Sequence, residues 1–457
     1  MDLYNLDGLE YLNLVKAGAY NLINDVDRIN MLNVFPVPDG DTGTNMRLSI
    51  EGGIKDEFND IKISSNAKKI ARGMVLAARG NSGVILSQFF YGLSKGVDGF
   101  DTITPKDFAK ALLKATERSY RAVETPTEGT ILTVMRESGE YLNENLDKVD
   151  TFIDLFNLYI ERAKISLENT PNLLPVLKKA GVVDSGGAGL ILVLEGMLKY
   201  LNGEKLESIL KVKDTNSTNN YYSGSAVQND TGKKVHKKYA TVAVANGRGL
   251  LVSLKEMGVD IIVSGGQTMN TSTQDFIDAF NCLDADNIFV FPNNGNILLA
   301  AQQAANNYDK ANIIVIPTKT LVEGYSACSM LNFDSDNLDE IKSELLSSFE
   351  NLSTLEVTYS VRDCVINDVD IKKGDYISLY DGELISSNKM RIEALKEAFK
   401  GISDIEDKAI VTLIVGSDVD DSEVEEIKEF IKSLNSYIEI YPVRGEQDIY
   451  SYIIGLE

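Results

Sequence analysis

The chain has 457 residues, enough for two or three domains, and its 44% hydrophobic and 25% charged content is typical of a soluble globular protein. A formal net charge of -23 argues against a nucleic-acid-binding protein, because phosphate backbones require a basic surface. The three cysteines are scattered without C-x-x-C spacing, which argues against a zinc site or a disulfide framework and favours a cytoplasmic location. We expect no membrane span, since no signal pattern and no long apolar run is present. The one histidine, His236, excludes a histidine triad.

The first half of the chain carries apolar side chains at helical spacing and almost none at period two. This pattern predicts an all-α region with about eight helices and with its glycines at the helix junctions. The expected helical segments are 8–31, 46–53, 66–78, 84–93, 105–123, 130–144, 149–168, 172–180 and 186–201. The polar, lysine-containing stretch 213–238 then reads as a flexible linker.

Beyond the linker, short apolar runs alternate with helical stretches. The expected strands are 239–245, 260–264, 287–291, 312–316, 355–362, 409–415 and 436–441. Alternation of this kind indicates an α/β fold with a mainly parallel sheet, and a break near residue 335 would give two subdomains.

The stretch N-V-F-P-V-P-D-G-D-T-G-T-N at 33–45 carries the chemistry around which the chain is organised. Its prolines exclude a helix and its glycines permit a tight turn, so Asp39 and Asp41 are displayed close together. Two such carboxylates repel each other unless a cation lies between them, and oxygen ligands of this type suit Mg²⁺. The neighbouring hydroxyl and amide groups belong to Thr42, Thr44, Asn33 and Asn45. The alternative is a surface turn without a ligand.

Three further glycine turns precede predicted helices: R-G-N-S-G at 79–83, P-T-E-G-T at 126–130 and V-D-S-G-G-A-G at 183–189. Amides at a helix N-terminus bind phosphate, and glycine lets the phosphate approach the backbone. Each turn alone could be a plain helix start, with Thr130 as an N-cap, or a site of tight helix packing. Together they predict a phosphate-and-metal site, provided that the helix starts converge. No Walker or kinase-loop motif is present.

These strings resemble a known family. Segments 33–46, 78–88, 126–134 and 171–190 are similar to the nucleotide-binding domain of the dihydroxyacetone-kinase type (DhaL). They are most similar to its variant in the catalytic subunit of bacterial fatty acid kinase. The second half resembles the same protein in V-S-G-G-Q-T-M-N at 263–270, P-N-N at 292–294, I-P-T-K at 316–319 and V-R-D at 361–363. The resemblance covers roughly 1–205 and 239–457.

The resemblance implies an all-α antiparallel eight-helix barrel over 1–205 and an α/β carrier-docking region over 239–457. The segment 206–238 would be a linker in place of the usual middle domain, which carries a Cys/His metal cluster. The implied cofactors are ATP and two Mg²⁺ ions. The implied catalytic residues are Asp39, Asp41, Asn81 and Ser82. The implied metal ligands are Asp39 and Asp41, with Asn33 near a third ligand position. The implied nucleotide-binding residues are Thr42, Thr44, Asn45, Gly80, Asn81, Ser82, Gly83, Gly129, Thr130, Asp184, Ser185, Gly186 and Gly187.

The function implied is ATP-dependent phosphorylation of the carboxylate of a fatty acid, giving an acyl phosphate for phospholipid metabolism. The fatty acid would arrive on a separate lipid-binding carrier protein of the DegV type. A carboxylate acceptor is already ionised at neutral pH and needs no general base. Two alternatives stay open: a nucleotide-binding regulatory or scaffold protein that lost catalysis with the middle domain, and a dihydroxyacetone-type small-molecule kinase. A homodimer is also left open.

Polar turns follow three of the predicted strands in the second half. They are Ser264–Thr268, Asn293 to Asn296 and Pro317–Lys319. Ligands bind at the carboxyl ends of strands in α/β sheets, so these turns predict a pocket or docking patch at one edge. The alternative is ordinary turn chemistry.

Overall fold

The structure is a computed structural model that describes residues 4–34, 40–56, 58, 60–210, 235–265, 270–360, 363–366 and 369–457. The chain divides into two compact units. One comprises Met1–Tyr222 with Ser272–Gln274, and the other comprises Ser223–Thr271 with Asp275–Glu457. The first is helical and the second contains the sheets, which confirms the predicted all-α half followed by an α/β half.

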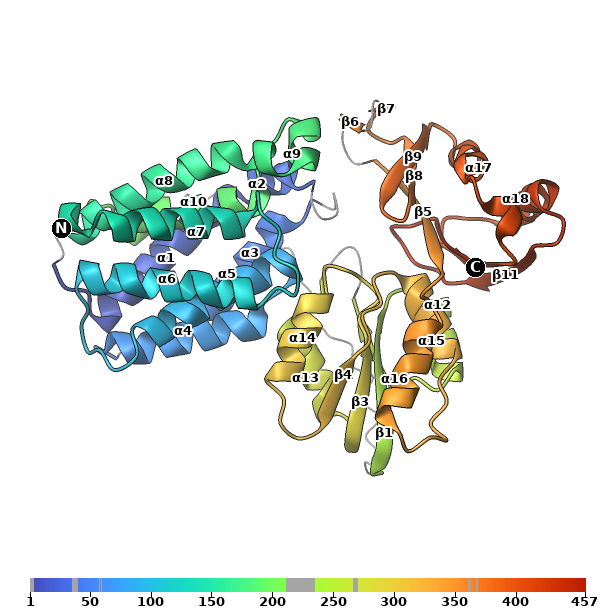
Figure 1. The fold of residues 1–457 in the computed structure, drawn as a ribbon, viewed down its shortest axis with the longest axis horizontal. Helices are drawn as coiled ribbons and strands as arrows, with labels where there is room; N and C mark the ends of the chain where they lie inside the picture. Colours follow the sequence, from blue (N-terminus) through green and yellow to red (C-terminus); the bar gives the residue numbers. More distant parts are fainter. Residues whose placement is uncertain are drawn as a thin grey trace. The chain divides into compact units, whose positions relative to one another are not determined.

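The helical unit is built from eleven α-helices in its described residues (Figure 1). They are α1 (Gly8–Ile23), α2 (Val26–Leu32), α3 (Thr42–Ile54), α4 (Ile63–Ala77), α5 (Gly80–Gly96), α6 (Pro105–Arg121), α7 (Ile131–Glu144), α8 (Phe152–Leu173), α9 (Pro175–Ala180), α10 (Ser185–Leu201) and α11 (Leu206–Ile209). The single helix predicted over 8–31 is two helices, interrupted at Asn24 and Asp25. The side chain of Asn24 donates to Ile209 O at 2.7 Å, and Asp25 occupies the N-cap position of α2.

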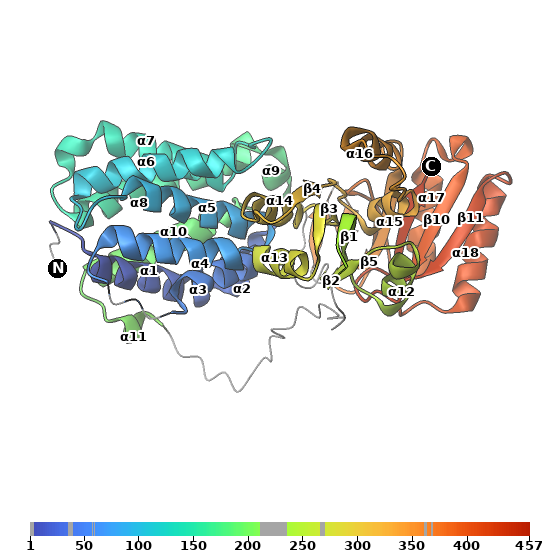
Figure 2. The ribbon, with the colours of Figure 1, turned by 90° about the horizontal axis from the view of Figure 1, so that it is seen from below.

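Eight of these helices form a closed ring of packed neighbours in the order α1, α3, α4, α5, α6, α7, α8 and α10, and α10 packs back on α1. Figure 1 and Figure 2 show the long helices lying side by side. The contact of α1 with α10 is close, because a methyl group at Gly196 would lie 2.4 Å from Ala17 O. The ring is consistent with the predicted barrel.

One apolar core fills the helical unit, with aromatic pairs such as Phe108 and Phe152, whose ring centroids are 5.5 Å apart. A cavity of about 10 Å³ lies within it, and Tyr11, Phe90 and Met197 are among its lining residues. The buried Tyr11 hydroxyl finds no hydrogen-bond partner among the described residues. A cavity of this size is near the lower limit for one water molecule, so it does not hold an acyl chain.

The second unit begins with a four-stranded parallel sheet in the order β2-β1-β3-β4. Its strands are β1 (Lys237–Ala245), β2 (Ile261–Ser264), β3 (Ala285–Phe291) and β4 (Asn312–Val315). Its helices are α12 (Arg248–Glu256), α13 (Thr273–Asn281), α14 (Leu298–Asn306), α15 (Leu321–Ser329) and α16 (Leu338–Ser347). Helices α13 and α14 cover one face, and α12, α15 and α16 cover the other (Figure 1, Figure 2). This is the doubly covered parallel sheet that the alternating pattern predicts.

A six-stranded sheet follows, in the order β11-β10-β12-β5-β8-β9. Its strands are β5 (Ser353–Tyr359), β8 (Tyr376–Tyr380), β9 (Glu383–Asn388), β10 (Ile410–Val415), β11 (Glu439–Arg444) and β12 (Tyr452–Leu456). The rest of this part is the hairpin of β6 (Cys364–Ile366) with β7 (Val369–Ile371), and the helices α17 (Arg391–Gly401) and α18 (Asp421–Leu434). Only β10 and β11 pair in parallel among its described strands, so the prediction of a mainly parallel sheet is wrong here.

Candidate functional site

The starts of α3, α5, α7 and α10 meet at one end of the helical unit. Ser185 Oγ of α10 donates to Thr42 Oγ1 of α3 at 3.0 Å, and Ser82 Oγ of α5 donates to Thr42 O at 3.4 Å. A methyl group at Gly186 would lie 3.2 Å from Ile131 Cβ, the first residue of α7. The helix starts that follow the four predicted turns are therefore neighbours in space.

Thr42 is the centre of this ring of helix starts. It is 4% exposed, and its hydroxyl accepts from Ser185 and donates to Asn33 Oδ1, while its carbonyl accepts from Ser82. Asn33 is the C-cap residue of α2 and is also buried. The Thr42 hydroxyl thus joins three helices, and it orients the side chain of Asn33, for which the family resemblance implies a place near a metal ligand.

Asp41 occupies the N-cap position of α3, but its side chain does not cap the helix. Asn30 of α2 does so instead, because its Oδ1 accepts from Thr44 N at 3.1 Å and its Nδ2 donates to Thr44 Oγ1 at 3.0 Å. Sequence reasoning missed Asn30, which lies before the motif. Asp39 lies outside the described residues.

The start of α5 is shaped by two glycines. Gly80 has a left-handed φ of 57°, and Arg79 at the N-cap position forms no side-chain cap. A methyl group at Gly83 would lie 2.2 Å from Ser49 Oγ and 3.0 Å from Asn45 O, both on α3. Ser49 is fully buried and donates to Asn45 O at 2.6 Å, so it cannot swing away. Gly83 therefore sets the distance between the starts of α5 and α3.

We expect Gly83→Ala to destabilise the helical unit by about 1 to 3 kcal/mol, the usual cost of overpacking a core. Urea unfolding measures this cost, and the Ser49→Ala/Gly83→Ala variant should recover part of it by removing the clashing hydroxyl. Gly139→Ala in α7 is the matched control, since its methyl would lie 3.3 Å from the end of Leu113 and 3.7 Å from Thr116 Oγ1 and would meet no backbone atom. Equal stability of the Gly83 and Gly139 variants would contradict the expectation.

Asp184 ties the starts of α10 and α7 together. Its Oδ2 accepts from Gly187 N at 2.7 Å, and its carboxylate also accepts from the backbone N–H of Ile131. Its own N–H donates to Thr170 Oγ1 of α8 at 3.1 Å. Burial raises the pKa of this carboxyl from 3.8 to about 6, although the two backbone donors act in the opposite direction. The structure thus gives Asp184 a capping role between two helices.

The turn before α7 is held by its own hydrogen bonds. Thr130 lies at the N-cap position, yet its hydroxyl donates to Thr127 O at 2.7 Å and does not cap the helix. Gly129 has a φ of 82°, and its N–H donates to Thr133 Oγ1 at 2.8 Å. Thr130 therefore occupies the predicted N-cap position of α7, but its side chain does not cap the helix.

The donor set at this end of the unit fits a magnesium–nucleotide group. Phosphate oxygens accept from helix N-terminal amides, and four helix starts are gathered here. Magnesium prefers carboxylate and amide oxygens, which Asp41 and Asn33 carry beside the start of α3. Gly80 gives the start of α5 its left-handed backbone, and Gly83 lets α5 pack closely on α3.

The polar turns of the second unit lie at one edge of the parallel sheet, as predicted. Asn293 and Thr318 form two hydrogen bonds there. Asn293 N donates to Thr318 Oγ1 at 3.1 Å, and Thr318 Oγ1 donates to Asn293 Oδ1 at 2.8 Å. Asn293 Nδ2 also donates to Val244 O at 2.9 Å. These two buried side chains therefore join strand ends through hydrogen bonds to each other. Segment 266–269 of the predicted patch lies outside the described residues.

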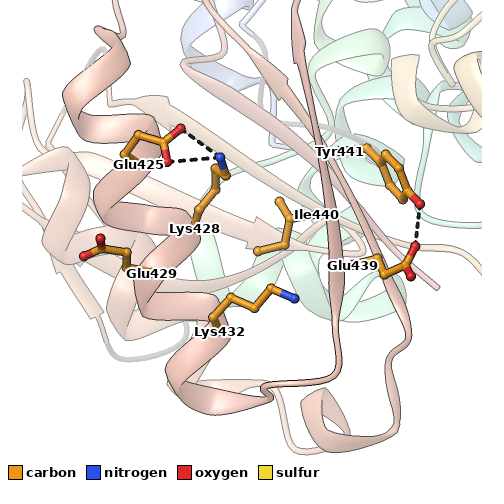
Figure 3. A pocket seen from close by; sticks show the side chains of 7 residues that line it. All are labelled: Glu425, Lys428, Glu429, Lys432, Glu439, Ile440 and Tyr441. Carbon is orange, nitrogen blue, oxygen red and sulfur yellow. Dashed lines mark hydrogen bonds and ion pairs between the residues drawn. The ribbon is translucent and has the colours of Figure 1, made fainter.

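A groove of about 600 Å³ lies between α18 and the edge strand β11 (Figure 3). Its lining residues are Glu425, Lys428, Glu429, Lys432, Glu439, Ile440 and Tyr441. Glu439 N donates to Ala409 O and Gly445 N donates to Val415 O, so the backbone N–H groups of the even-numbered residues of β11 point to the open edge. Pro442 is one of these and removes an outward donor, which protects an edge against strand pairing.

Comparison with known proteins shows the family. The model of the FakA-like C-terminal region of fatty acid kinase matches residues 240–457, and that of the DAK2 domain matches residues 36–199. Protein YloV of Bacillus subtilis is 33% identical over 556 residues, which cover 100% of both chains. An uncharacterized protein of Staphylococcus saprophyticus is 32% identical over 552 residues, which cover 99% of both chains. The chain therefore belongs to the FakA-like family of fatty acid kinase proteins.

Both alignments are longer than this chain, so each relative has positions that this chain lacks. Among solved structures, dihydroxyacetone kinase of C. freundii with AMP-PNP and Mg²⁺ matches 41% of this chain and 33% of its own, at 15% identity and a TM-score of 0.33. The FakB3 protein of Streptococcus pneumoniae loaded with linoleic acid matches 48% of this chain and 99% of its own, at 11% identity and a TM-score of 0.34. TM-scores this low do not establish a common fold. No helix in the described part of the chain is long and apolar enough to span a membrane.

Proposed function

We propose that this protein transfers the terminal phosphoryl group of ATP to the carboxylate of a fatty acid bound by a separate DegV-type carrier, giving an acyl phosphate. The observation that carries the proposal is the convergence of four helix starts beside Asp41, in a chain of the FakA-like family. The second unit would dock the carrier.

In this proposal the residues at the helix starts position the phosphates and stabilise their charge. Phosphoryl transfer asks for little covalent chemistry from the protein itself. Asp39 and Asp41 would hold two Mg²⁺ ions, with Asn33 beside them, and the metal would neutralise charge on the phosphate oxygens. The amides from Gly80 to Gly83 would bind the phosphates, and Asn81 and Ser82 would orient the transferred group. Thr44, Gly129 and Ser185 to Gly187 would border the nucleotide.

The acyl chain would stay on the carrier. The described cavity of the helical unit is far too small for it, at about 10 Å³. The fatty acid carboxylate is ionised near neutral pH, so the site needs no general base, in accord with a chain whose one histidine lies in the other unit.

The test combines the purified chain, Mg²⁺-ATP and a fatty-acid-loaded DegV-type carrier, and traps the acyl phosphate with hydroxylamine. We expect hydroxamate only with the loaded carrier. Binding of ATP without transfer would favour a regulatory or scaffold protein, which is the outcome expected if the usual middle domain is required for turnover. Phosphorylation of dihydroxyacetone without any carrier would favour a small-molecule kinase.

A further inference from the structure

Glu128 is the centre of a polar cluster that the proposed function does not use. Its Oε1 accepts from Tyr120 OH at 2.9 Å. Its Oε2 accepts from Thr133 Oγ1 at 2.5 Å and from Arg136 Nη2 at 3.0 Å. Arg136 Nε also donates to Tyr120 OH at 3.2 Å. The carboxylate is thus held from two helices, by Tyr120 of α6 and by Thr133 and Arg136 of α7.

The cluster acts directly on the turn before α7. Thr133 Oγ1 donates to Glu128 and accepts from Gly129 N at 2.8 Å, so one hydroxyl joins the carboxylate to the next peptide. Gly129 is left-handed, with a φ of 82°, and a methyl group there would lie 2.9 Å from Leu174 Cβ at the end of α8. Side chains of α6 and α7 therefore fix the turn before any ligand is present.

The same turn is part of the ring of helix starts. Ile131 begins α7 directly after it, and its N–H is bound by Asp184. Ile131 also packs against Gly186 of α10, whose neighbour Ser185 binds Thr42. A shift of the Glu128 carboxylate would move the turn and the start of α7. Through Ile131 it would also reach the starts of α10 and α3.

We propose that Glu128 is a positioning residue of the nucleotide site: held by Tyr120, Thr133 and Arg136, it fixes the 127–130 turn in the shape that receives the nucleotide. This inference rests on the proposed function. A site whose supporting hydrogen bonds exist in advance loses less free energy when it binds its ligand. Glu128 itself does not touch the reacting groups in this account.

The test is calorimetric titration of Mg²⁺-ATP into the full chain and its Glu128→Ala and Glu128→Gln variants. We expect Glu128→Ala to weaken binding by about tenfold, taking the lower end of the range for residues that orient metal ligands. Glu128→Gln keeps one acceptor oxygen and should fall between wild type and alanine. Glu140→Ala is the matched control, because Glu140 pairs with the same arginine at 3.4 Å but lies away from the turn.

Hydrogen exchange of the unliganded variants separates positioning from a general structural role. Faster exchange in Glu128→Ala confined to 126–131 would support the inference, and faster exchange throughout α6 and α7 would overturn it. Wild-type affinity in Glu128→Ala would overturn this inference and leave the proposed function standing. Absence of Mg²⁺-ATP binding by the wild type would overturn both.

Discussion

Replacing Asp39 and Asp41 together with alanine is expected to abolish Mg²⁺-dependent ATP binding and to leave the helical unit folded. Magnesium is held by hard oxygen ligands, and residues that only support a metal ligand already change affinity by roughly 10- to 100-fold. Removing two ligands should exceed that effect. Folding should survive because Asp41 does not cap α3, whose start is held by Asn30 and Thr42. Calorimetry with Mg²⁺-ATP measures the first effect, and urea unfolding measures the second.

The matched control is the Asp25→Ala/Asp27→Ala variant, which removes the same number of acidic charges at the other end of α2. Asp25 is half-exposed and pairs with Arg28 at 3.4 Å, a surface pair that contributes little. Its ATP affinity should equal that of the wild type. Retained affinity in the Asp39/Asp41 variant would remove both residues from the proposed metal site.

Helices of the first unit could be predicted where the sequence carries both a pattern and a boundary signal. The predicted start at residue 105 is correct, since Pro105 occupies the first turn of α6 and Thr104 Oγ1 accepts from Asp107 N at 3.3 Å. Helix α8 starts three residues later than predicted, although Thr151 and Asp154 form a capping box that is readable in the sequence. Local signals therefore decide boundaries better than the apolar period does.

The prediction of a parallel sheet also did not use a local signal, here a hairpin signal in the antiparallel part of the six-stranded sheet. Strands β8 and β9 are joined at Asp381 and Gly382, which have positive φ values of 48° and 83°. Asp-Gly between two apolar runs is a strong hairpin signal, and it was available in the sequence. The predicted alternation of strands and helices instead favoured a parallel sheet, which does not contain this hairpin.

The candidate site shows the limit of reasoning from spacing. The glycine turns and acidic residues could be identified because glycine and aspartate are preferred in turns and at helix starts. The hydrogen bond from Ser185 to Thr42 joins residues 143 positions apart, and Asn30 is an ordinary helical asparagine until Thr44 lies beside it. Which side chains hold the ring together is a property of the packed helices, and the sequence alone does not state it.

At pH 4, where the buried carboxyl is mostly protonated and carries no charge penalty, Asp184→Ala is expected to destabilise the helical unit by about 2 to 4 kcal/mol, because two helix starts lose their acceptor and each cap contributes roughly 1 to 2 kcal/mol. The bonds at stake are those to Gly187 N and Ile131 N, both in a buried setting. Mg²⁺-ATP binding should weaken as well, since α7 and α10 would separate at the ring. Unchanged urea unfolding in this variant would contradict the capping role.

Asp184→Asn separates the cap from the charge, because the amide oxygen still accepts while the side chain stays neutral. The folded-state pKa of about 6 lies above the ordinary 3.8, so the folded protein binds this proton more tightly than the unfolded chain. The resulting stability is complete below pH 3.8, falls as the pH rises towards 6, and is lost above it. The total change is about 3 kcal/mol at about 1.4 kcal/mol per pKa unit. The unfolding free energy of the wild type minus that of Asp184→Asn should therefore decrease between about pH 4 and pH 6, and a flat difference would show that the buried carboxyl is not perturbed.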